Sequence, residues 1–359
     1  MIGVTLDDGP SPEEMARRRV IAAWLFAICA MIYVMVLIGG LTRLTYSGLS
    51  MVEWKPLTGW LPPMSEAAWQ DTFAKYQGFP EYQKLNLGMS LAEFKEIFWL
   101  EYIHRLWGRL MGVAFLVPFV VFFIRGWIGK DLLPKLLGMF VLGGLQGVLG
   151  WYMVKSGLVD EPDVSAYRLT AHLGFALLIY AYVLWVALGL TGRPATGREA
   201  IDPAGLRRYA GGLALLVAVT ILSGGFMAGT NAGFAYNTFP TMDGAWLPEG
   251  LFGLTPWYLS LFEDITTIQF THRLLATLVF LSVAGFWLAS FRAGLAGRAR
   301  LAVHFVMVAV LVQVSLGLST LLLIVPVPLA AAHQAGAVAL LSMIFWALHE
   351  LRQREEGEL

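Results

Sequence analysis

The alternation of apolar and polar stretches along the chain predicts a series of membrane-spanning helices. Residues 20–42 contain no charged side chain, and a helix needs about 20 mostly apolar residues to cross a bilayer. Similar runs predict seven more spans: 98–124, 134–154, 169–190, 208–228, 266–291, 301–323 and 330–349. Pro326 and Pro328 separate the last two spans, because proline interrupts a helix. The pattern therefore predicts an all-α integral membrane protein with eight transmembrane helices and both termini on one side.

The segment between the first two spans, about 43–97, is long and mixed in character. Aromatic residues recur within it at helical spacing: Trp69, Phe73 and Tyr76. This spacing predicts a short amphipathic helix on the surface of the bundle or of the membrane. Ser90 and Glu93 form a capping-box pattern, so the second span is expected to begin there as one long helix. An outer lid without chemistry is the alternative for this segment.

Composition supports a membrane protein and narrows the chemistry. Hydrophobic residues make up 57% of the 359 residues and charged residues only 14%, which is unusual for a soluble domain of this length. The formal net charge is zero and no long basic run is present, so no nucleic-acid partner is expected. Cys29 is the only cysteine, which excludes an internal disulfide and a CxxCH haem attachment. Any metal chemistry must therefore use the six histidines.

The positions of lysine and arginine predict the orientation. Residues 1–19 end in three consecutive arginines, and basic residues recur in the other segments on the same side. The connection 229–265, on the opposite side, contains acidic residues but no lysine or arginine. Because cytoplasmic segments are enriched in basic residues, we expect both termini in the cytoplasm. No signal-type cleavage site follows residue 42, so the first span is expected to be retained as an anchor.

Motifs of the first half recur in the same order in the second half. The matching pairs include Gly39-Gly40 with Gly224-Gly225, Ser47-Gly48-Leu49 with Ala232-Gly233-Phe234, His104-Arg105 with His272-Arg273, Gln146 with Gln313, and Ala171-His172 with Ala332-His333. Each half holds four spans, so this pattern predicts a parallel repeat of two four-helix bundles. The predicted segments are a cytoplasmic N-terminus 1–19, a first bundle 20–192 with the outer segment 43–97, a cytoplasmic linker 193–207, a second bundle 208–350 and a cytoplasmic tail 351–359. The paired glycines are expected to permit close helix packing, and the two glutamines to form interhelical hydrogen bonds.

Four of the six histidines fall at the outer ends of predicted helices: His104, His172, His272 and His333. Two imidazoles facing each other across a four-helix bundle can bind one haem iron axially. The expected pairs are the first two and the last two of these histidines. His304 and His349 lie at inner helix ends without a counterpart in the repeat, so we expect them to be solvated or hydrogen-bonded.

The two halves differ in charged residues near the histidines. The first half has Glu101, Arg43 and Arg109 where the second has Gln269, Ala228 and Thr277. An acid one helical turn from an iron-bound ring can take up a proton or stabilise positive charge, which an amide cannot do. The first half is therefore predicted to be reactive and the second to store electrons. The alternative for the acid is an exposed side chain at a helix start, favoured by the helix dipole.

Several arginines are candidates for binding haem propionates. Arg105 and Arg273 each follow a histidine, and guanidinium groups bind carboxylates well. Arg43 and Arg109 are further candidates of the same kind. The alternative for the arginines next to the histidines is a helix-end charge that reaches the lipid headgroups.

These motifs together resemble the haem A synthases of respiratory bacteria and mitochondria. The resemblance lies in Gly39 to Thr45, Ser47 to Pro56, Glu101 to Arg105 and the four helix-end histidines, and it covers about residues 20–350. It implies an oxidoreductase that converts the C8 methyl group of haem O to the formyl group of haem A through successive hydroxylations. It also implies a location in the bacterial inner (cytoplasmic) membrane, with the haem sites toward the periplasmic face.

The resemblance implies roles for individual residues. Glu101 matches the essential glutamate of the family, and whether it acts as a base or as an electrostatic stabiliser stays open. His104 and His172 match the histidines on the substrate side. His272 and His333 match the ligands of a resident haem b, through which electrons leave.

The implied partners are haem O with its farnesyl tail in a lipid-facing groove, the haem O synthase (a farnesyltransferase), an electron acceptor and membrane lipid. Whether the chain forms a homo-oligomer stays open. Some relatives carry a cysteine pair in an outer loop; this chain lacks it, so a thiol relay is excluded and the acceptor is unidentified. The main alternative is a di-haem b electron-transfer cytochrome or quinol oxidoreductase that uses the same four histidines. A transporter is the second alternative. It is disfavoured because the ionisable groups gather at the outer end of the helices rather than near the membrane midplane.

Overall fold

Eight long helices dominate the computed structural model, which describes residues 11–55, 58–157, 164–191 and 203–356. They are α1 (Pro12–Leu44), α4 (Leu91–Ile124), α5 (Leu133–Gly157), α6 (Ala166–Leu190), α7 (Pro203–Gly229), α9 (Ile265–Arg292), α10 (Gly297–Leu322) and α11 (Val327–Glu356). Each is long and apolar enough to cross a membrane, and the described residues form no strand. The predicted all-α membrane architecture with eight spans is therefore confirmed.

Most of these helices extend beyond their apolar cores because polar residues continue them. α1 begins at Pro12 after the N-cap Ser11, so it includes residues 12–19 of the predicted N-terminal segment. The capping box of Ser90 and Glu93 is present, and α4 begins directly after it at Leu91 as one long helix. At the other boundaries, residues 203–207 of the predicted linker open α7 and residues 351–356 of the predicted tail end α11. Residues 193–202 and 357–359 lie outside the described residues.

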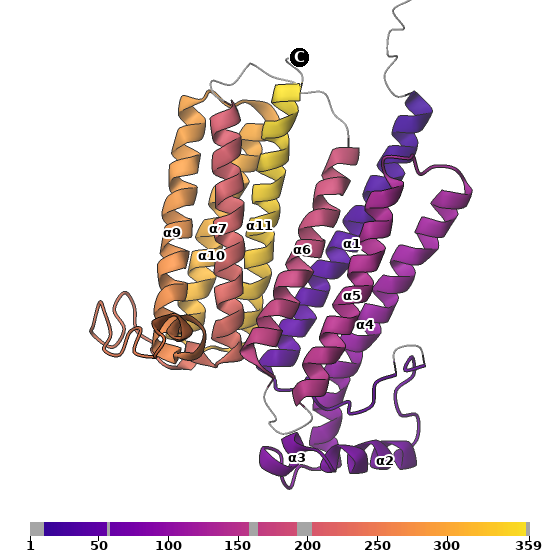
Figure 1. Ribbon diagram of the computed structural model, residues 1–359, viewed down its shortest axis with the longest axis vertical. Helices are drawn as coiled ribbons and strands as arrows, with labels where there is room; N and C mark the ends of the chain where they lie inside the picture. The colour runs from indigo at the N-terminus through magenta and orange to yellow at the C-terminus, as the bar shows by residue number, and fades with distance from the viewer. Residues whose placement is uncertain (1–10, 56–57, 158–163, 192–202, 357–359) are drawn as a thin grey trace, which may run out of the picture.

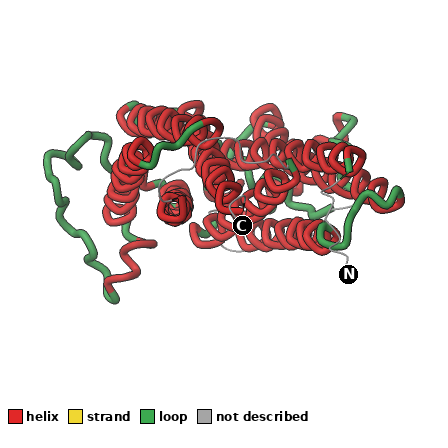
Figure 2. The backbone as a smooth tube through the Cα atoms, turned by 90° about the horizontal axis from the view of Figure 1, so that it is seen from above, coloured by secondary structure: helices red, strands yellow, loops and turns green. Residues whose placement is uncertain are grey.

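Figure 1 shows the long helices in two groups, with α1, α4, α5 and α6 in one and α7, α9, α10 and α11 in the other. The groups meet along α1, α6, α7 and α11, which contact one another across the middle of the molecule. Figure 2 shows the same elongated arrangement from above. Leu25, Val183, Leu213 and Ile344, one from each of these four helices, are almost fully buried in one continuous apolar core. The two groups therefore pack as a single body.

Polar contacts also join the two groups. The Gln334 side-chain amide donates to the Val36 carbonyl at 2.9 Å, and the Tyr180 and Ser342 hydroxyls lie 2.7 Å apart. Inside a membrane such bonds replace water as partners of the polar groups. They connect α11 with α1 and α6 with α11, and so fix how one group of helices sits against the other.

One end of the molecule carries the long connections. Both α2 (Glu66–Gln77) and α3 (Pro80–Lys84) lie there beneath α4, and the 230–264 connection, with η1 (Ala232–Phe234), η2 (Trp257–Leu259) and α8 (Ser260–Glu263), lies at the same end (Figure 1). The start of α1 and the end of α11 lie at the opposite end. The predicted amphipathic helix is α2: Trp69 and Tyr76 are buried on it, with ring centroids 4.9 Å from Phe98 and 5.0 Å from Phe94. It packs on the beginning of α4.

Candidate functional site

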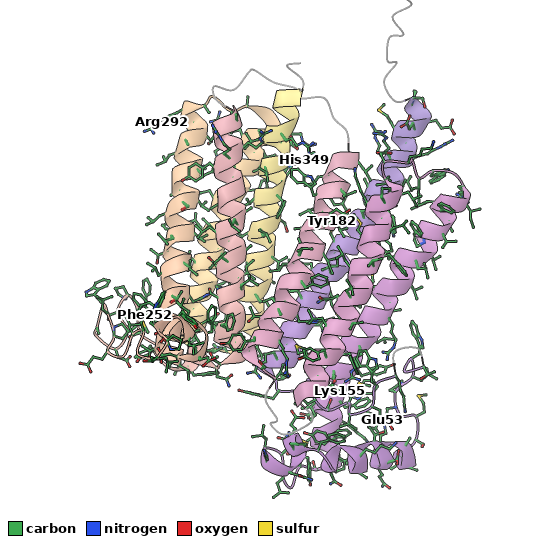
Figure 3. All side chains as sticks on the ribbon, viewed as in Figure 1. Glu53, Lys155, Tyr182, Phe252, Arg292 and His349 are labelled. Atoms are coloured by element: carbon green, nitrogen blue, oxygen red, sulfur yellow. The ribbon has the colours of Figure 1, made fainter. Side chains whose placement is uncertain are left out.

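The four paired histidines lie at one end of the molecule. Each is within about four turns of the start of its helix, and all four helices begin at the end that carries the long connections. They are His104 on α4, His172 on α6, His272 on α9 and His333 on α11. Figure 3 shows Glu53 at the end with the long connections, and Arg292 and His349 at the opposite end. The fold therefore gathers the predicted iron ligands at a common depth.

A glycine of a neighbouring helix faces each of these rings. The pairs are His104 with Gly39 of α1, His172 with Gly150 of α5, His272 with Gly224 of α7 and His333 with Gly317 of α10. A Cβ atom at Gly150 or Gly317 would lie 2.9 Å or 2.8 Å from Cε1 of the facing ring, closer than side chains pack. Gly150 and Gly317 therefore leave room for the imidazoles that face them, whereas a Cβ atom at Gly39 or Gly224 would lie 3.3 Å or 3.4 Å from the ring, at or near ordinary contact.

The second glycine of each predicted pair has a different neighbour. A Cβ atom at Gly40 would overlap the side-chain amide of Gln334, and one at Gly225 would lie 2.8 Å from the Thr170 hydroxyl. Both neighbours belong to the other group of helices. The predicted role in close helix packing therefore holds for Gly40 and Gly225, whereas Gly39 and Gly224 each face a histidine ring.

The pair His272 and His333 has dimensions that suit one haem iron. Their ring centroids are 6.5 Å apart and their planes are inclined by 80°. An imidazole nitrogen binds a first-row metal at about 2 Å, which puts the centres of two axial imidazoles about 6 Å apart. Ser223 Oγ lies 2.7 Å from Nδ1 of His272, and Gln313 Nε2 lies 3.1 Å from Nδ1 of His333. Among the described residues, no hydrogen bond involves Nε2 of either ring. The Ser223 hydroxyl can accept from Nδ1–H of His272, which leaves Nε2 of that ring free for a metal, whereas the Gln313 amide N–H donates to Nδ1 of His333 and places that ring's proton on Nε2.

The pair His104 and His172 is held less completely. Gln146 Nε2 donates to the His172 carbonyl at 3.0 Å and lies 3.4 Å from Nε2 of the same ring. The buried Nδ1 atom of His172 has no hydrogen-bond partner in the described parts of the chain. An unsatisfied ring nitrogen of this kind fits a site that is completed by a bound group.

The predicted interhelical role of the two glutamines is confirmed. Gln146 on α5 reaches α6, and Gln313 on α10 reaches α11 by donating to the His333 carbonyl at 3.0 Å. Each glutamine thus anchors the helix turn that carries a histidine. His304 is hydrogen-bonded as expected, since its Nδ1 accepts the Trp287 indole N–H at 3.0 Å.

Glu101 is buried, with 2% of its surface exposed, so the alternative of an exposed helix-start acid is wrong. Its carboxylate accepts hydrogen bonds from Ser50 Oγ and the Met51 N–H, both at 2.7 Å, and from Arg105 at 2.5 Å. A buried carboxylate needs such donors to offset the loss of water. The sequence did not single out Ser50, although it lies within the Ser47-to-Pro56 motif.

The two arginines next to histidines bind backbone carbonyls of the outer connections. Arg105 donates to Met51 at 2.8 Å and to Glu53 at 3.0 Å. Arg273 does the same in the second group of helices, donating to Tyr236 at 2.8 Å and to Thr238 at 2.9 Å. The sequence predicted that these arginines bind haem propionates or reach the lipid headgroups, and neither prediction included the contacts with carbonyls. Pairing with propionates stays a prediction.

Arg43 and Arg109 also contact backbone carbonyls. Arg43, at the end of α1, donates to Ala228 at 3.1 Å and to Gly229 at 3.2 Å, which are the last residues of α7. A cation at a helix C-terminus satisfies free carbonyls and complements the helix dipole. Arg109 donates to the Lys55 carbonyl at 2.7 Å and so holds the outer segment. Propionate binding by either residue stays a prediction.

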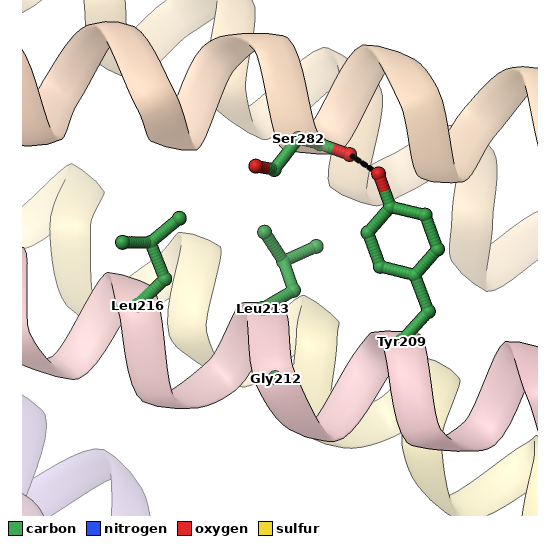
Figure 4. Close-up of a pocket in the computed structure, with 5 residues that line it drawn as sticks. All are labelled: Tyr209, Gly212, Leu213, Leu216 and Ser282. Atoms are coloured by element: carbon green, nitrogen blue, oxygen red, sulfur yellow. Dashed lines mark hydrogen bonds between the residues drawn. The ribbon is translucent and has the colours of Figure 1, made fainter.

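A shallow cavity elsewhere is separate from the histidines. It has a volume of about 200 Å³ and is lined by Tyr209, Gly212, Leu213, Leu216 and Ser282 of α7 and α9 (Figure 4). The Tyr209 hydroxyl donates to the Ser282 carbonyl at 3.0 Å across it. The cavity contains none of the four histidines and is not the candidate site.

Comparison with known proteins identifies the family. The family model COX15-CtaA, described as a cytochrome oxidase assembly protein, matches residues 22–345. The heme A synthase of Nitrosospira multiformis is 53% identical over 343 residues, covering 95% of this chain and 96% of that protein. The heme A synthase of Paramagnetospirillum magneticum is 53% identical over 348 residues, covering 96% and 98%. Heme A synthase COX15 of Bos taurus is 45% identical over 359 residues, covering 98% and 87%. The chain therefore belongs to the COX15-CtaA family of cytochrome oxidase assembly proteins.

Proposed function

We propose that this chain is a haem A synthase, which oxidises the C8 methyl group of haem O to a formyl group through successive hydroxylations. The observation that carries the proposal is the difference between two similar histidine pairs. Both pairs lie at one end of the molecule, but among the described residues only the pair His104 and His172 has a buried carboxylate, Glu101, one turn away. The names of the relatives support this activity.

We assign the pair His104 and His172 to the substrate haem O. The unsatisfied Nδ1 atom of His172 and the sparse hydrogen bonding of this pair suit a group that enters and leaves. We assign His272 and His333 to a resident haem b, because their separation and the hydrogen bond between Ser223 and Nδ1 of His272 suit a permanent ligand. A haem b held there would supply a one-electron carrier.

Glu101 is assigned to the stabilisation of positive charge at the reacting methyl carbon. An ionised carboxylate offers about four acceptor positions. Ser50, Met51 and Arg105 fill three of them with donors. The carboxylate is therefore an acceptor in a fixed position. One of its acceptor positions stays free, and we assign this position to the substrate. This arrangement favours electrostatic stabilisation over proton uptake.

The residues around Glu101 would hold the outer segment over the substrate site. Arg105 and Arg109 both bind carbonyls of the 51–55 stretch, and Ser50 binds the carboxylate itself. Closing such a site excludes water, which strengthens the electrostatic interactions inside it. We propose a bacterial inner membrane location with the termini in the cytoplasm, so that haem O reaches this site from the lipid near the periplasmic face. Two partners complete the proposal. One is a haem O synthase that supplies the substrate, and the other is an unidentified electron acceptor.

A di-haem b electron-transfer cytochrome is the second candidate, because the pair His272 and His333 would serve it equally well. Mass spectrometry of haems extracted from the purified full-length protein, produced in cells that make haem O, separates the two. A synthase should carry haem O or haem A together with haem b. Haem b as the sole pigment, with no haem A formed from added haem O, would favour the cytochrome and contradict the proposal.

A further inference from the structure

Ser223 joins the second histidine pair to the backbone of α7. Its Oγ atom lies 2.7 Å from Nδ1 of His272 and also 2.7 Å from the carbonyl oxygen of Thr220, one turn earlier on the same helix. Both distances are those of good hydrogen bonds. Ser223 directly precedes Gly224, which faces the same ring. One turn of α7 therefore both faces the imidazole and binds it.

The two hydrogen bonds of Ser223 fix the tautomer of His272. A hydroxyl carries one hydrogen, and a carbonyl oxygen can only accept. When Ser223 donates to Thr220, its oxygen must accept from Nδ1–H of His272 for both bonds to form. The proton then resides on Nδ1, and the lone pair of Nε2 is free to bind a metal. A hydrogen bond from the second ring nitrogen also holds the ring in orientation and makes it a stronger ligand.

The first histidine pair has no equivalent of this arrangement. The residue before Gly39 is Ile38, whose side chain cannot accept a hydrogen bond. No hydrogen bond to the His104 ring is present among the described residues, and Nδ1 of His172 is unsatisfied there. The two pairs thus differ in how firmly their rings are oriented, although each ring faces a glycine.

We propose that Ser223 is a positioning residue that makes the second pair a permanent haem site. By accepting a hydrogen bond from Nδ1–H of His272, Ser223 would leave Nε2 free for iron and would make the ring a stronger ligand. The absence of such an acceptor beside His104 suits a substrate haem that must be released as product. The inference rests on the proposed assignment of a resident haem b to His272 and His333.

The test compares Ser223→Ala with Ser223→Thr, which keeps a hydroxyl. Ser290→Ala is the matched control, because Ser290 is buried and donates to the Trp287 carbonyl in the same way but lies near the end of α9, away from His272. The measurements on purified full-length protein are the ratio of haem b to protein, its midpoint potential and its low-spin electron paramagnetic resonance signal. Loss of an outer hydrogen bond typically weakens metal binding by roughly 10–100-fold. Ser223→Ala should show this loss and an upward shift of the potential, because the ligand becomes less basic.

Ser223→Thr should restore haem content and potential toward the wild-type values, and Ser290→Ala should leave both unchanged. An equal effect of Ser290→Ala would show a general packing defect and overturn the proposal. Wild-type haem content and potential in Ser223→Ala would also overturn it, while leaving the proposed function intact if His272→Ala still loses haem b. If the wild-type protein holds no haem b that depends on His272, the assignment of the resident haem fails and this inference fails with it.

Discussion

Glu101 and Gln269 lie at matching positions of α4 and α9, and their hydrogen bonds to the outer connections run in opposite directions. The Glu101 carboxylate accepts the Met51 N–H at 2.7 Å, whereas the Gln269 amide donates to the Tyr236 carbonyl at 2.9 Å. Both side chains are almost fully buried. Glu101 therefore brings a carboxylate to the first connection, whereas Gln269 brings a neutral amide to the second.

Replacement of Glu101 by glutamine should stop the reaction without removing the histidine sites. The amide removes the negative charge and places N–H groups against the donors Ser50 and Arg105. We expect a loss of about 1.5–3 kcal/mol of stability, the usual worth of a hydrogen bond to a charged group. Mass spectrometry of the extracted pigment should then find haem O or a hydroxylated intermediate. The exposed Glu96→Gln on the same helix is the control, and a normal yield of haem A from Glu101→Gln would contradict the assigned role.

Replacement of His272 by alanine should remove the resident haem b and leave the fold largely intact. The ring supplies one of two ligands, and its neighbours Ser223 and Gly224 belong to a helix that packs elsewhere along its length. Absorption spectra of the reduced protein should lose the low-spin haem b signal. His304→Ala is a suitable control, because His304 bonds to Trp287 at the opposite end of the molecule. A retained low-spin haem b signal in His272→Ala would refute the ligand assignment.

Replacement of Gly150 by alanine should disturb the substrate site. Its Cβ would lie 2.9 Å from Cε1 of His172, so the ring must move. Gly147→Ala on the same helix is the matched control, because a Cβ there meets nothing within 4 Å. That control should be neutral or gain about 0.5–1 kcal/mol from the better helix propensity of alanine. We expect haem A formation to fall in Gly150→Ala only; equal activity in the two variants would show that the ring tolerates the added methyl group.

The attachment of α2 to the 51–55 stretch should weaken at acid pH. Hydrogen bonds from Lys55 and Lys75 lower the pKa of Glu53 below its ordinary value of 4.5. A carboxyl group with a lowered pKa stabilises the folded state fully above its ordinary pKa, and this contribution is lost as the pH falls through the lowered value. Amide hydrogen exchange of α2 should therefore show weaker protection below pH 4.5 than near neutral pH. The change should be smaller in Glu53→Gln, and an identical pH dependence in both proteins would exclude this contact as the cause.

Local patterns in the sequence were sufficient for the helices and for the depth of the histidines. Crossing a bilayer requires long apolar runs, so residues 20–42 and the seven later runs could be recognised without any tertiary information. The capping box at Ser90 and Glu93 predicted the beginning of α4 because its contacts lie within one turn. Glu101 and His104 were placed on one helix by their spacing alone.

Only the tertiary structure decided which groups these residues contact. Ser50 and Met51 reach Glu101 from another segment, Arg43 caps α7 in the other group of helices, and Ser223 binds His272 from a neighbouring helix. Such contacts join positions far apart in the chain, and hydrophobic periodicity carries no information about them. The sequence by itself therefore determined where the helices cross the membrane and which side chains lie near one end. The packing of helices against one another decided which carboxylate is buried and which imidazole is held in place, because hydrogen bonds depend on distances of a few ångströms that only the folded chain defines.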